Sequence, residues 1–234
     1  MRLDKFIADA GIGSRKEIKQ ALKEGIVCVN GEVIKNAALH INPETDRVSF
    51  AGQEIEYKPF VYLMLNKPAD TVSATYDNRD ATVISLVPEE FSHYELFPVG
   101  RLDKDTEGFL LITNDGVLSH NLLSPKKHVD KRYYARLDAA IAEGDKEKFQ
   151  NGIVLDDGYK TLPAVLDAEI GSCEAYVTIQ EGKFHQVKRM FADVGKHVTY
   201  LKRVSFGKLT LDETLEPGEM RELTDTELAL LKGE

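Results

Sequence analysis

The pattern of apolar and polar positions at the start of the chain predicts two short helices. Apolar residues first recur at the i, i+3, i+4 and i+7 spacing of an amphipathic helix, until glycines interrupt the pattern. Ser14 and Glu17 then have the spacing of a capping box, which predicts a second helix that ends at Gly25. The two apolar stripes are formed by Leu3, Phe6, Ile7 and Ala10 and by Ile18, Ala21 and Leu22.

A small hairpin is predicted directly after these helices. Asn30-Gly31 lies between alternating apolar residues, and this pair is typical of the two-residue turn that joins antiparallel strands. The segment 52–60 has the character of a linker, in which Pro59 favours an extended conformation at Lys58. We therefore expect a first domain of two helices and a hairpin at residues 1–58.

The second part of the chain, residues 59–234, alternates strand-like apolar runs with helix-like stretches. This order predicts an α+β domain built on a mixed, mostly antiparallel sheet. The strand-like runs lie at residues 62–65, 109–113, 133–137, 164–170, 175–179 and 197–201, and the helix-like stretches lie at residues 116–123, 143–150 and 185–194.

The composition agrees with a two-domain protein. The 234 residues are 42% hydrophobic and 29% charged, which is typical of soluble globular chains with one large domain or two unequal ones. Cys28 and Cys173 lie far apart, which argues against a disulfide framework and against a cysteine-based metal site. The sequence shows no apolar leader and no run of the ~18 apolar residues that a membrane span needs, so we expect a cytoplasmic protein.

The net charge of −9 at first argues against a nucleic-acid partner, because such binding depends on cationic contacts with phosphates. The charge is unevenly distributed, however. Residues 1–23 have a net charge of +3, residues 126–136 of +4 and residues 183–208 of +6, whereas residues 210–234 have a net charge of −6. This distribution predicts separate positive surfaces at the first two helices and at a cleft of the second domain.

A charged loop at residues 100–108 is the strongest candidate for a site of chemistry, because it runs into an apolar strand that can hold side chains at the edge of a sheet. Asp103, Asp105 and Glu107 mimic the first ligands of a calcium-binding EF-hand loop. Position 12 of such a loop would be Asn114 in place of a bidentate glutamate, and the preceding residues cannot form the entering helix. A calcium site is therefore not expected.

Several sequence blocks resemble known families. The stretch RLDKFIADAGIGSRKEIKQALKEGIVCVNGEVI closely resembles the S4 RNA-binding module, which implies that these helices dock on structured RNA. The loop GRLDKDTEGFLLITNDG resembles the catalytic loop of the RsuA-like family of ribosomal RNA pseudouridine synthases. Two further blocks match this family in the same order, YLMLNKPADTVSAT at 62–75 and EGKFHQVKRMFADVGKHVTYLKRVSFGKLTL at 181–211. The resemblance thus covers nearly the whole chain.

The resemblance implies an enzyme that isomerises a uridine of 16S ribosomal RNA to pseudouridine, namely uridine 516 in the family's usual rRNA numbering. The bond between ribose C1′ and uracil N1 is broken and C1′ is rejoined to C5, which requires no cofactor and no metal. The implied partner is 16S rRNA or a small-subunit assembly intermediate, bound by a monomer without membrane contact. Two alternatives are a 23S rRNA pseudouridine synthase of the same family and a non-catalytic RNA-binding protein of ribosome assembly. The spelling HQVK favours the 16S enzyme.

The resemblance identifies Asp103 as the catalytic carboxylate. Asp105 is expected to shape the loop, with a catalytic role for Asp105 as the alternative. A cation within about 4–6 Å keeps an enclosed carboxylate ionised. At 100° per residue, Lys188 lies on the flank of the apolar stripe of the helix at 185–194, whereas Arg189 lies nearly opposite the stripe. We therefore expect Lys188 to pair with Asp103 and Arg189 to contact RNA phosphate, with an exchange of these two roles as the alternative.

Two adjacent tyrosines in a strand point to opposite faces of the sheet. The K-x-Y strand of the family identifies Tyr133 as the residue that stacks on uracil and assists proton removal, so Tyr134 is expected to pack in the core. His185, at a predicted helix start, is expected to cap the helix or to lie in the core rather than to contact RNA. The remaining candidates for substrate or RNA contact are Arg101, Leu102, Asn66, Lys67, Arg15, Lys16 and Lys19.

Overall fold

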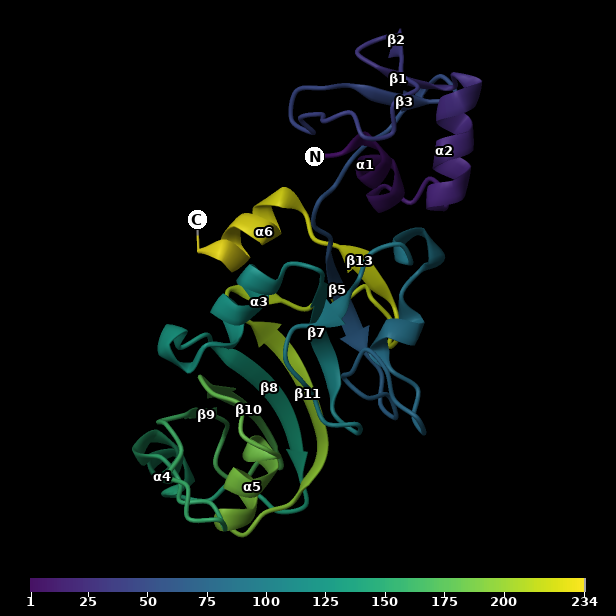
Figure 1. Ribbon diagram of the computed structural model, residues 1–234. Coiled ribbons are helices and arrows are strands. Elements are labelled where there is room, and N and C mark those ends of the chain that lie inside the picture. The colour runs from purple at the N-terminus through teal and green to yellow at the C-terminus, as the bar shows by residue number, and fades with distance from the viewer. Residues whose placement is uncertain (234) are drawn as a thin grey trace. The chain divides into compact units, whose positions relative to one another are not determined.

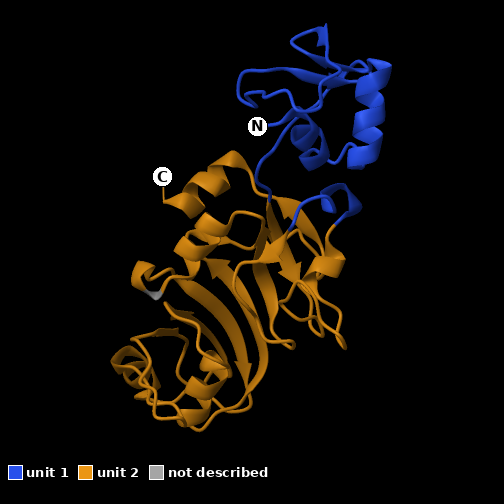
Figure 2. Ribbon diagram, in the orientation of Figure 1, with its two compact units in different colours: residues 1–61, 88–95 blue, residues 62–87, 96–234 orange. Residues whose placement is uncertain are grey.

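The computed structural model describes residues 1–233, without the side chain of Pro125. The chain forms two compact units (Figure 2). Unit 1 comprises Met1–Val61 together with Pro88–Glu95. Unit 2 comprises Tyr62–Val87 and the chain from Leu96 onwards. The chain therefore leaves unit 1, forms the first strand of unit 2, and returns to unit 1 for one short segment.

Unit 1 contains the two predicted helices, α1 (Leu3–Asp9) and α2 (Arg15–Glu24). The predicted capping box is confirmed: the Ser14 backbone N–H donates to Glu17 Oε2 over 2.7 Å, and the Glu17 N–H donates to Ser14 Oγ over 3.4 Å. Gly25 ends α2 with a left-handed φ of 76°, as its position predicted. The apolar stripes of the two helices are buried in one core.

The predicted hairpin is also confirmed. Asn30 and Gly31 both have positive φ, 52° and 84°, which is the conformation of the two-residue turn that joins twisted antiparallel strands. The hairpin belongs to a larger sheet with the order β2-β1-β3-β4. Its strands are β1 (Val27–Val29), β2 (Glu32–Val33), β3 (Val48–Phe50) and β4 (Gln53–Glu54).

The expected linker at 52–60 is largely part of unit 1. Its first residues include β4, Ile55 is buried in the core of this unit, and the ring of Tyr57 lies 4.8 Å from that of Phe6. The returning segment contacts the same stretch, because the Tyr94 hydroxyl donates to the Lys58 carbonyl oxygen over 3.0 Å. In the stretch 52–60, the apolar residues that pack against unit 1 are spaced too irregularly for the sequence to show that they belong to its core.

Unit 2 is built on a mixed sheet with the strand order β13-β5-β7-β11-β8-β10-β9 (Figure 1). Neighbouring strands on this path are antiparallel except β7 and β11, so the predicted mixed, mostly antiparallel sheet is confirmed. β6 pairs with β7, and β12 pairs with β11. The strands are β5 (Tyr62–Lys67), β6 (Phe97–Pro98), β7 (Glu107–Thr113), β8 (Lys131–Leu137), β9 (Val165–Asp167), β10 (Glu174–Ile179), β11 (Val198–Phe206), β12 (Leu209–Thr210) and β13 (Met220–Glu222).

Four helices of unit 2 lie at two ends of this sheet (Figure 1). At one end, α3 (Gly116–Leu123) and α6 (Asp225–Lys232) bury Leu118, Leu122 and Leu231 in a cluster with Phe109 and Phe206 of the sheet. At the other end lie α4 (Asp145–Asn151) and α5 (Gln186–Asp193), whose Phe149 and Phe191 rings are 5.1 Å apart. The three predicted helix-like stretches correspond to α3, α4 and α5, whereas α6 and β13 were not predicted.

A close approach between β7 and β11 fixes the position at which β7 begins. Gly108 lies opposite Arg203 in the parallel pair and has a φ of 99°. A Cβ atom at residue 108 would overlap the Arg203 carbonyl oxygen, so only glycine fits here. This contact holds the charged loop before β7 against the middle of the sheet. Among residues 1–233, no helix combines the length and the apolar character that crossing a membrane requires.

Candidate active site

The loop between β6 and β7 is held in place by buried polar contacts. Ser73 Oγ accepts from the Leu102 N–H over 3.0 Å and donates to the Leu102 carbonyl oxygen over 3.1 Å. The Thr106 N–H donates to the Asp103 carbonyl oxygen over 3.1 Å. These bonds fix the backbone on both sides of Asp103. The Leu102 side chain is buried, so the part of it that is open to a ligand is the part that lines a small pocket beside Asp103.

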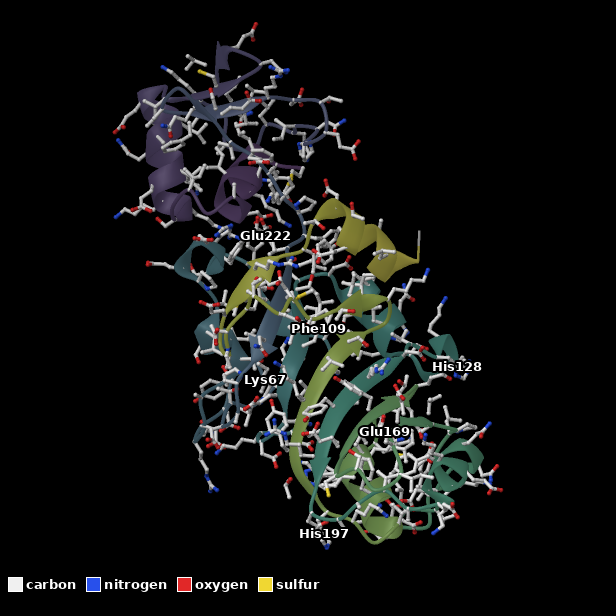
Figure 3. The ribbon with its side chains drawn as sticks, turned by 180° about the vertical axis from the view of Figure 1, so that it is seen from behind. Lys67, Phe109, His128, Glu169, His197 and Glu222 are labelled. Atoms are coloured by element: carbon white, nitrogen blue, oxygen red, sulfur yellow. The ribbon has the colours of Figure 1, made fainter. Side chains whose placement is uncertain are left out.

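Lys67, the last residue of β5, supports the same loop from inside the protein (Figure 3). Its ammonium group is fully buried and donates to the carbonyl oxygens of Pro68, Lys104 and Thr106 over 2.9, 3.1 and 2.9 Å. Burial lowers the pKa of Lys67 to about 8, although nearby carboxylates oppose this shift. Lys67 thus supplies three hydrogen bonds to the backbone, two of them to the loop before β7.

The structure does not support the expectation that Asn66 and Lys67 contact RNA, because both side chains are buried and donate their hydrogen bonds within the protein. Asn66 Nδ2 donates to the Leu215 carbonyl oxygen over 2.7 Å, so this residue ties β5 to the C-terminal segment. In the sequence, the position of Asn66 and Lys67 within the block YLMLNKPADTVSAT suggested that they contact a ligand. Only the tertiary structure shows that the sheet encloses them.

Lys188, on α5, lies beside the loop. Its Nζ atom is 3.0 Å from Asp103 Oδ2 and 2.6 Å from Asp105 Oδ1. Burial alone would lower the pKa of Lys188, but the hydrogen bonds to Asp105 and Asp103 outweigh burial and raise it above its usual value. Burial likewise opposes the effect of Lys188 on Asp105, and the net effect lowers the pKa of that carboxyl. Lys188 therefore remains a cation between two carboxylates.

The two aspartates differ in their surroundings. The side chain of Asp105 is 72% exposed, whereas that of Asp103 is 27% exposed and lines a small pocket with a volume of about 60 Å³. We call this the aspartate pocket. Asp103 is the one carboxylate in its described lining, which also includes Tyr133 and Thr106. The side-chain oxygen of Thr106 is buried and has no hydrogen-bond partner among the described residues.

Arg189 does not reach this pocket. Its guanidinium is paired with Asp156 and, over 2.8 Å, with Asp157. These hydrogen bonds raise the pKa of Arg189 and leave its charge neutralised by two neighbouring carboxylates. The structure therefore offers no support for the expected contact between Arg189 and an RNA phosphate. It also does not show the alternative, in which Arg189 instead of Lys188 pairs with Asp103.

Tyr133 and Tyr134 occupy opposite faces of β8, as strand geometry requires. Tyr133 is buried and lines the aspartate pocket. Tyr134 is only partly buried, and its ring lies 5.4 Å from that of Tyr176 and 6.1 Å from that of Tyr200. The expectation that Tyr134 packs in the core is wrong, because its side chain is only partly buried and lies against the rings of two other tyrosines.

Phe184 and His185 form a stacked aromatic pair beside Asp103, which the sequence interpretation missed. Their ring centroids are 3.7 Å apart with an interplanar angle of 19°. His185 occupies the N-cap position of α5 with a φ of 51°, yet its side chain makes no capping bond, and its Nε2 atom lies 3.7 Å from Asp103 Oδ1. Phe184 is 75% exposed. In the sequence, an aromatic residue directly before the HQVK block could have indicated that Phe184 belongs to the site.

A larger pocket of about 610 Å³ adjoins the aspartate pocket and shares Arg101, Tyr133, Gly182 and Lys183 with it. We call it the cationic pocket. Glu181 is the one acidic residue in its described lining, so the predicted positive charge of the cleft is present. The cations in this lining are Arg101, Lys126, Lys131, Lys183 and Arg203.

The candidate RNA-binding residues of unit 1 lie on α2. Arg15, Lys16 and Lys19 are all exposed, whereas Ile18 between them is buried. The helix thus separates an apolar side from a cationic one. Among residues 1–233, no group of three His, Cys, Asp or Glu side chains is arranged to hold a metal ion.

Comparisons with known proteins agree with these observations. The family described as RNA pseudouridylate synthase matches residues 61–193, and the S4 domain matches residues 1–48. The Bacillus subtilis (strain 168) protein named uncharacterized RNA pseudouridine synthase YtzG is 50% identical over 99% of this chain and 98% of its own length. Ribosomal small subunit pseudouridine synthase A of Vibrio cholerae is 45% identical over 98% of both chains. Its counterpart in Escherichia coli (strain K12) is 42% identical over 98% of this chain and 99% of its own.

A solved structure described as a pseudouridylate synthase is similar over 99% of both chains, with a TM-score of 0.69 and 36% sequence identity. This similarity extends across both units. A second structure, of an H/ACA ribonucleoprotein bound to a substrate RNA that contains 2′-deoxyuridine, covers 82% of this chain with a TM-score of 0.51 and 19% identity, and shares the fold.

Proposed function

The chain belongs to the RNA pseudouridylate synthase family, and we propose that it isomerises a uridine of 16S ribosomal RNA with Asp103 as its catalytic carboxylate. The relatives from Vibrio cholerae and Escherichia coli, which are named for the ribosomal small subunit, support this choice of substrate. The observation that carries the catalytic assignment is the pairing of Asp103 with Lys188 in a pocket that Tyr133 also lines.

The reaction needs an ionised carboxylate at the base or the sugar, because the C1′–N1 bond is broken and C1′ is rejoined to C5 without net oxidation or hydrolysis. Asp103 meets this need as nucleophile or as electrostatic partner of the reacting sugar. Asp105, although closer to Lys188 than Asp103 is, is exposed outside the pocket lining and is assigned a supporting role. Lys188 supplies the positive charge that keeps a partly enclosed carboxylate ionised.

Tyr133 is proposed to hold the base. The uridine must leave its stack in the RNA, and an aromatic face in the pocket compensates for the stacking that is lost. Formation of the C1′–C5 bond also requires that the proton at C5 be removed, and the Tyr133 hydroxyl is proposed to assist this step. Thr106 offers an unpartnered hydroxyl in the same pocket, which suits a polar edge of uracil.

The Phe184 and His185 pair is proposed to support a nucleotide next to the target. Phe184 is exposed beside the pocket and stacked on His185, so one of its ring faces is already backed by an aromatic ring. A base that neighbours the extruded uridine loses a stacking partner, and an exposed aromatic side chain can replace it.

The substrate is proposed to be 16S rRNA within a small-subunit assembly intermediate, with uridine 516 as the target. The cations of α2 and those of the cationic pocket are proposed to contact the phosphates of this RNA. We further propose that the enzyme acts as a monomer and, since its substrate is assembled there, in the cytoplasm. Neither a cofactor nor a metal has a role in this reaction scheme.

The proposed substrate is tested by incubating the protein with 16S and 23S transcripts and with assembly particles from a strain that lacks the gene. Pseudouridine is mapped by carbodiimide modification and primer extension. We expect one new stop in 16S rRNA, at uridine 516. A stop confined to 23S rRNA would support pseudouridine formation but identify 23S rRNA as the substrate. The absence of a stop in every RNA would favour a non-catalytic RNA-binding protein of ribosome assembly.

A further inference from the structure

Two of the cations in the cationic pocket are buried. Lys131 is 8% exposed and Arg203 is 2% exposed, although both line the pocket. They lie on the neighbouring strands β8 and β11, and both approach the ring of Phe206, with 5.6 Å from Lys131 Nζ and 4.9 Å from Arg203 Cζ to the centroid. Two buried like charges on one aromatic ring form an unusual arrangement.

Within residues 1–233, neither cation forms an ion pair. Lys131 Nζ donates to the Val129 carbonyl oxygen over 2.9 Å, and Arg203 Nε donates to the Phe109 carbonyl oxygen over 2.7 Å. Arg203 Nη2 is buried without a hydrogen-bond partner. Burial and the charge of Arg203 lower the pKa of Lys131 to about 8. Both buried cations therefore lack a negatively charged hydrogen-bond partner, and such a partner would stabilise them.

The one carboxylate in the described lining is already engaged elsewhere. Glu181 Oε2 accepts from the Tyr159 hydroxyl over 2.7 Å, and Oε1 accepts from the Leu162 N–H over 2.8 Å and from Gln186 Nε2 over 3.0 Å. Glu181 thus organises the wall of the pocket and forms no ion pair with either buried cation, although its charge and that of Asp130 oppose the lowering of the Lys131 pKa. An anion from outside the chain is the partner that would do so.

We propose that the cationic pocket binds one backbone phosphate of the RNA, with Lys131 and Arg203 as its buried ligands. This inference rests on the proposed function, because the phosphate belongs to the RNA that carries the target uridine. Arginine suits phosphate because its planar donor group can contact two oxygens at once. Arg101, Lys126 and Lys183 provide further positive charge in the lining of the pocket.

The position of the pocket gives the phosphate a role beyond affinity. Tyr133 and Arg101 line both pockets, so a phosphate held in the larger one lies next to the nucleotide whose base enters the smaller one. Fixing that phosphate restricts the sugar to which it is bonded. The two buried cations are therefore positioning residues, which set where C1′ lies relative to Asp103.

The proposal is tested by equilibrium binding of a synthetic 16S rRNA fragment centred on uridine 516. In a series of such fragments, each phosphate flanking the target is replaced in turn by a neutral methylphosphonate. We compare the wild type, Lys131→Gln, and the matched control Lys146→Gln, which changes an exposed lysine on α4. For one linkage, the neutral substitution should weaken binding to the wild type and to the control about tenfold. The same substitution should have a clearly smaller effect on Lys131→Gln, in which Arg203 is the one buried ligand that remains.

The salt dependence and the thermal stability provide two further readouts. Lys131→Gln should lower the slope of log K against log salt by about 0.7 for a single-stranded segment. Its melting temperature should be equal to or above that of the wild type, because a desolvated, unpaired charge has been removed. A purely structural lysine would give a lower melting temperature and unchanged RNA affinity.

The proposal is overturned if every neutral linkage weakens binding of the wild type and Lys131→Gln by the same factor, or if no linkage weakens either. All of these readouts are binding or stability measurements and require no product. A failure to form pseudouridine would therefore count against the proposed function and leave the test of the phosphate site intact.

Discussion

Lys188 Nζ lies 3.0 Å from Oδ2 of Asp103, and this contact joins α5 to the loop before β7. The apolar stripe of α5 packs into unit 2, and Lys188 on its flank reaches the pocket without leaving the helix. The pair thus links the packing of a helix to the charge state of the proposed catalytic group.

Replacing Lys188 with glutamine should lower kcat at least tenfold, equivalent to about 1.4 kcal/mol, because a charge-assisted hydrogen bond to the carboxylate is lost. Lys188→Arg should retain most of the activity, since it preserves the charge. Arg189→Gln is the matched control on the neighbouring residue. Its partners Asp156 and Asp157 are exposed, so we expect activity within about threefold of the wild type. Single-turnover kinetics on 16S rRNA measures all three, and the reverse ranking would transfer the role to Arg189.

Lys67 should give the stability of the protein a specific pH dependence. Its pKa is about 8 in the folded chain and about 10.4 in an unfolded one, so the unfolded chain binds more protons between these values. The contribution of Lys67 to the free energy of unfolding should therefore rise with pH between about 8 and 10, by up to about 1.4 kcal/mol per pH unit.

This rise is measured as the difference between the wild type and Lys67→Met in urea denaturation at several pH values, in which the effects of other groups cancel. A difference that stays flat between pH 7.5 and 10 would show that burial does not lower the pKa of Lys67.

Phe184→Ala should weaken RNA binding about tenfold, because base stacking on an exposed aromatic ring contributes about 1–3 kcal/mol. Phe184→Tyr should bind like the wild type, since it retains the ring. Val117→Ala, which truncates an equally exposed apolar residue on α3, is the control. Fluorescence anisotropy with the 16S fragment measures these affinities. Equal binding by Phe184→Ala and the control would remove Phe184 from the substrate site.

The cations of α2 should contribute affinity without contributing to the chemistry. In a variant with glutamine at Arg15, Lys16 and Lys19, the slope of log K against log salt should fall by about 2, at roughly 0.7 for each phosphate that the variant no longer neutralises. The value of kcat at saturating RNA should stay within about twofold. A control with glutamine at the exposed residues Lys146, Lys148 and Lys160 should keep the wild-type slope. A large loss of kcat in the α2 variant would contradict a role limited to docking.

The sequence predicted those features that depend on neighbouring residues. The capping box of Ser14 and Glu17, the Asn30-Gly31 turn and the flank position of Lys188 each follow from local spacing, and each is present in the structure. Such features are determined by the geometry of a single helix or turn, which the residue order encodes directly.

Features that depend on distant parts of the chain were not predicted. Lys67 is buried because the sheet and the loop enclose it, and Arg189 turns to Asp156 and Asp157 because folding brings that segment to α5. The strand β13, which pairs with β5, is only three residues long and has no recognisable period. Long-range pairing of this kind leaves no periodic signal in a single sequence.

The comparison of Asp103→Asn with Asp105→Asn tests the central claim most directly. Each substitution removes one carboxylate charge next to Lys188, but only Asp103 lines the pocket. Pseudouridine formation in 16S particles is measured at saturating enzyme by carbodiimide mapping, and RNA binding is measured in parallel. We predict that Asp103→Asn binds RNA and forms no pseudouridine, whereas Asp105→Asn keeps activity within about tenfold of the wild type. Full activity in Asp103→Asn would contradict this account.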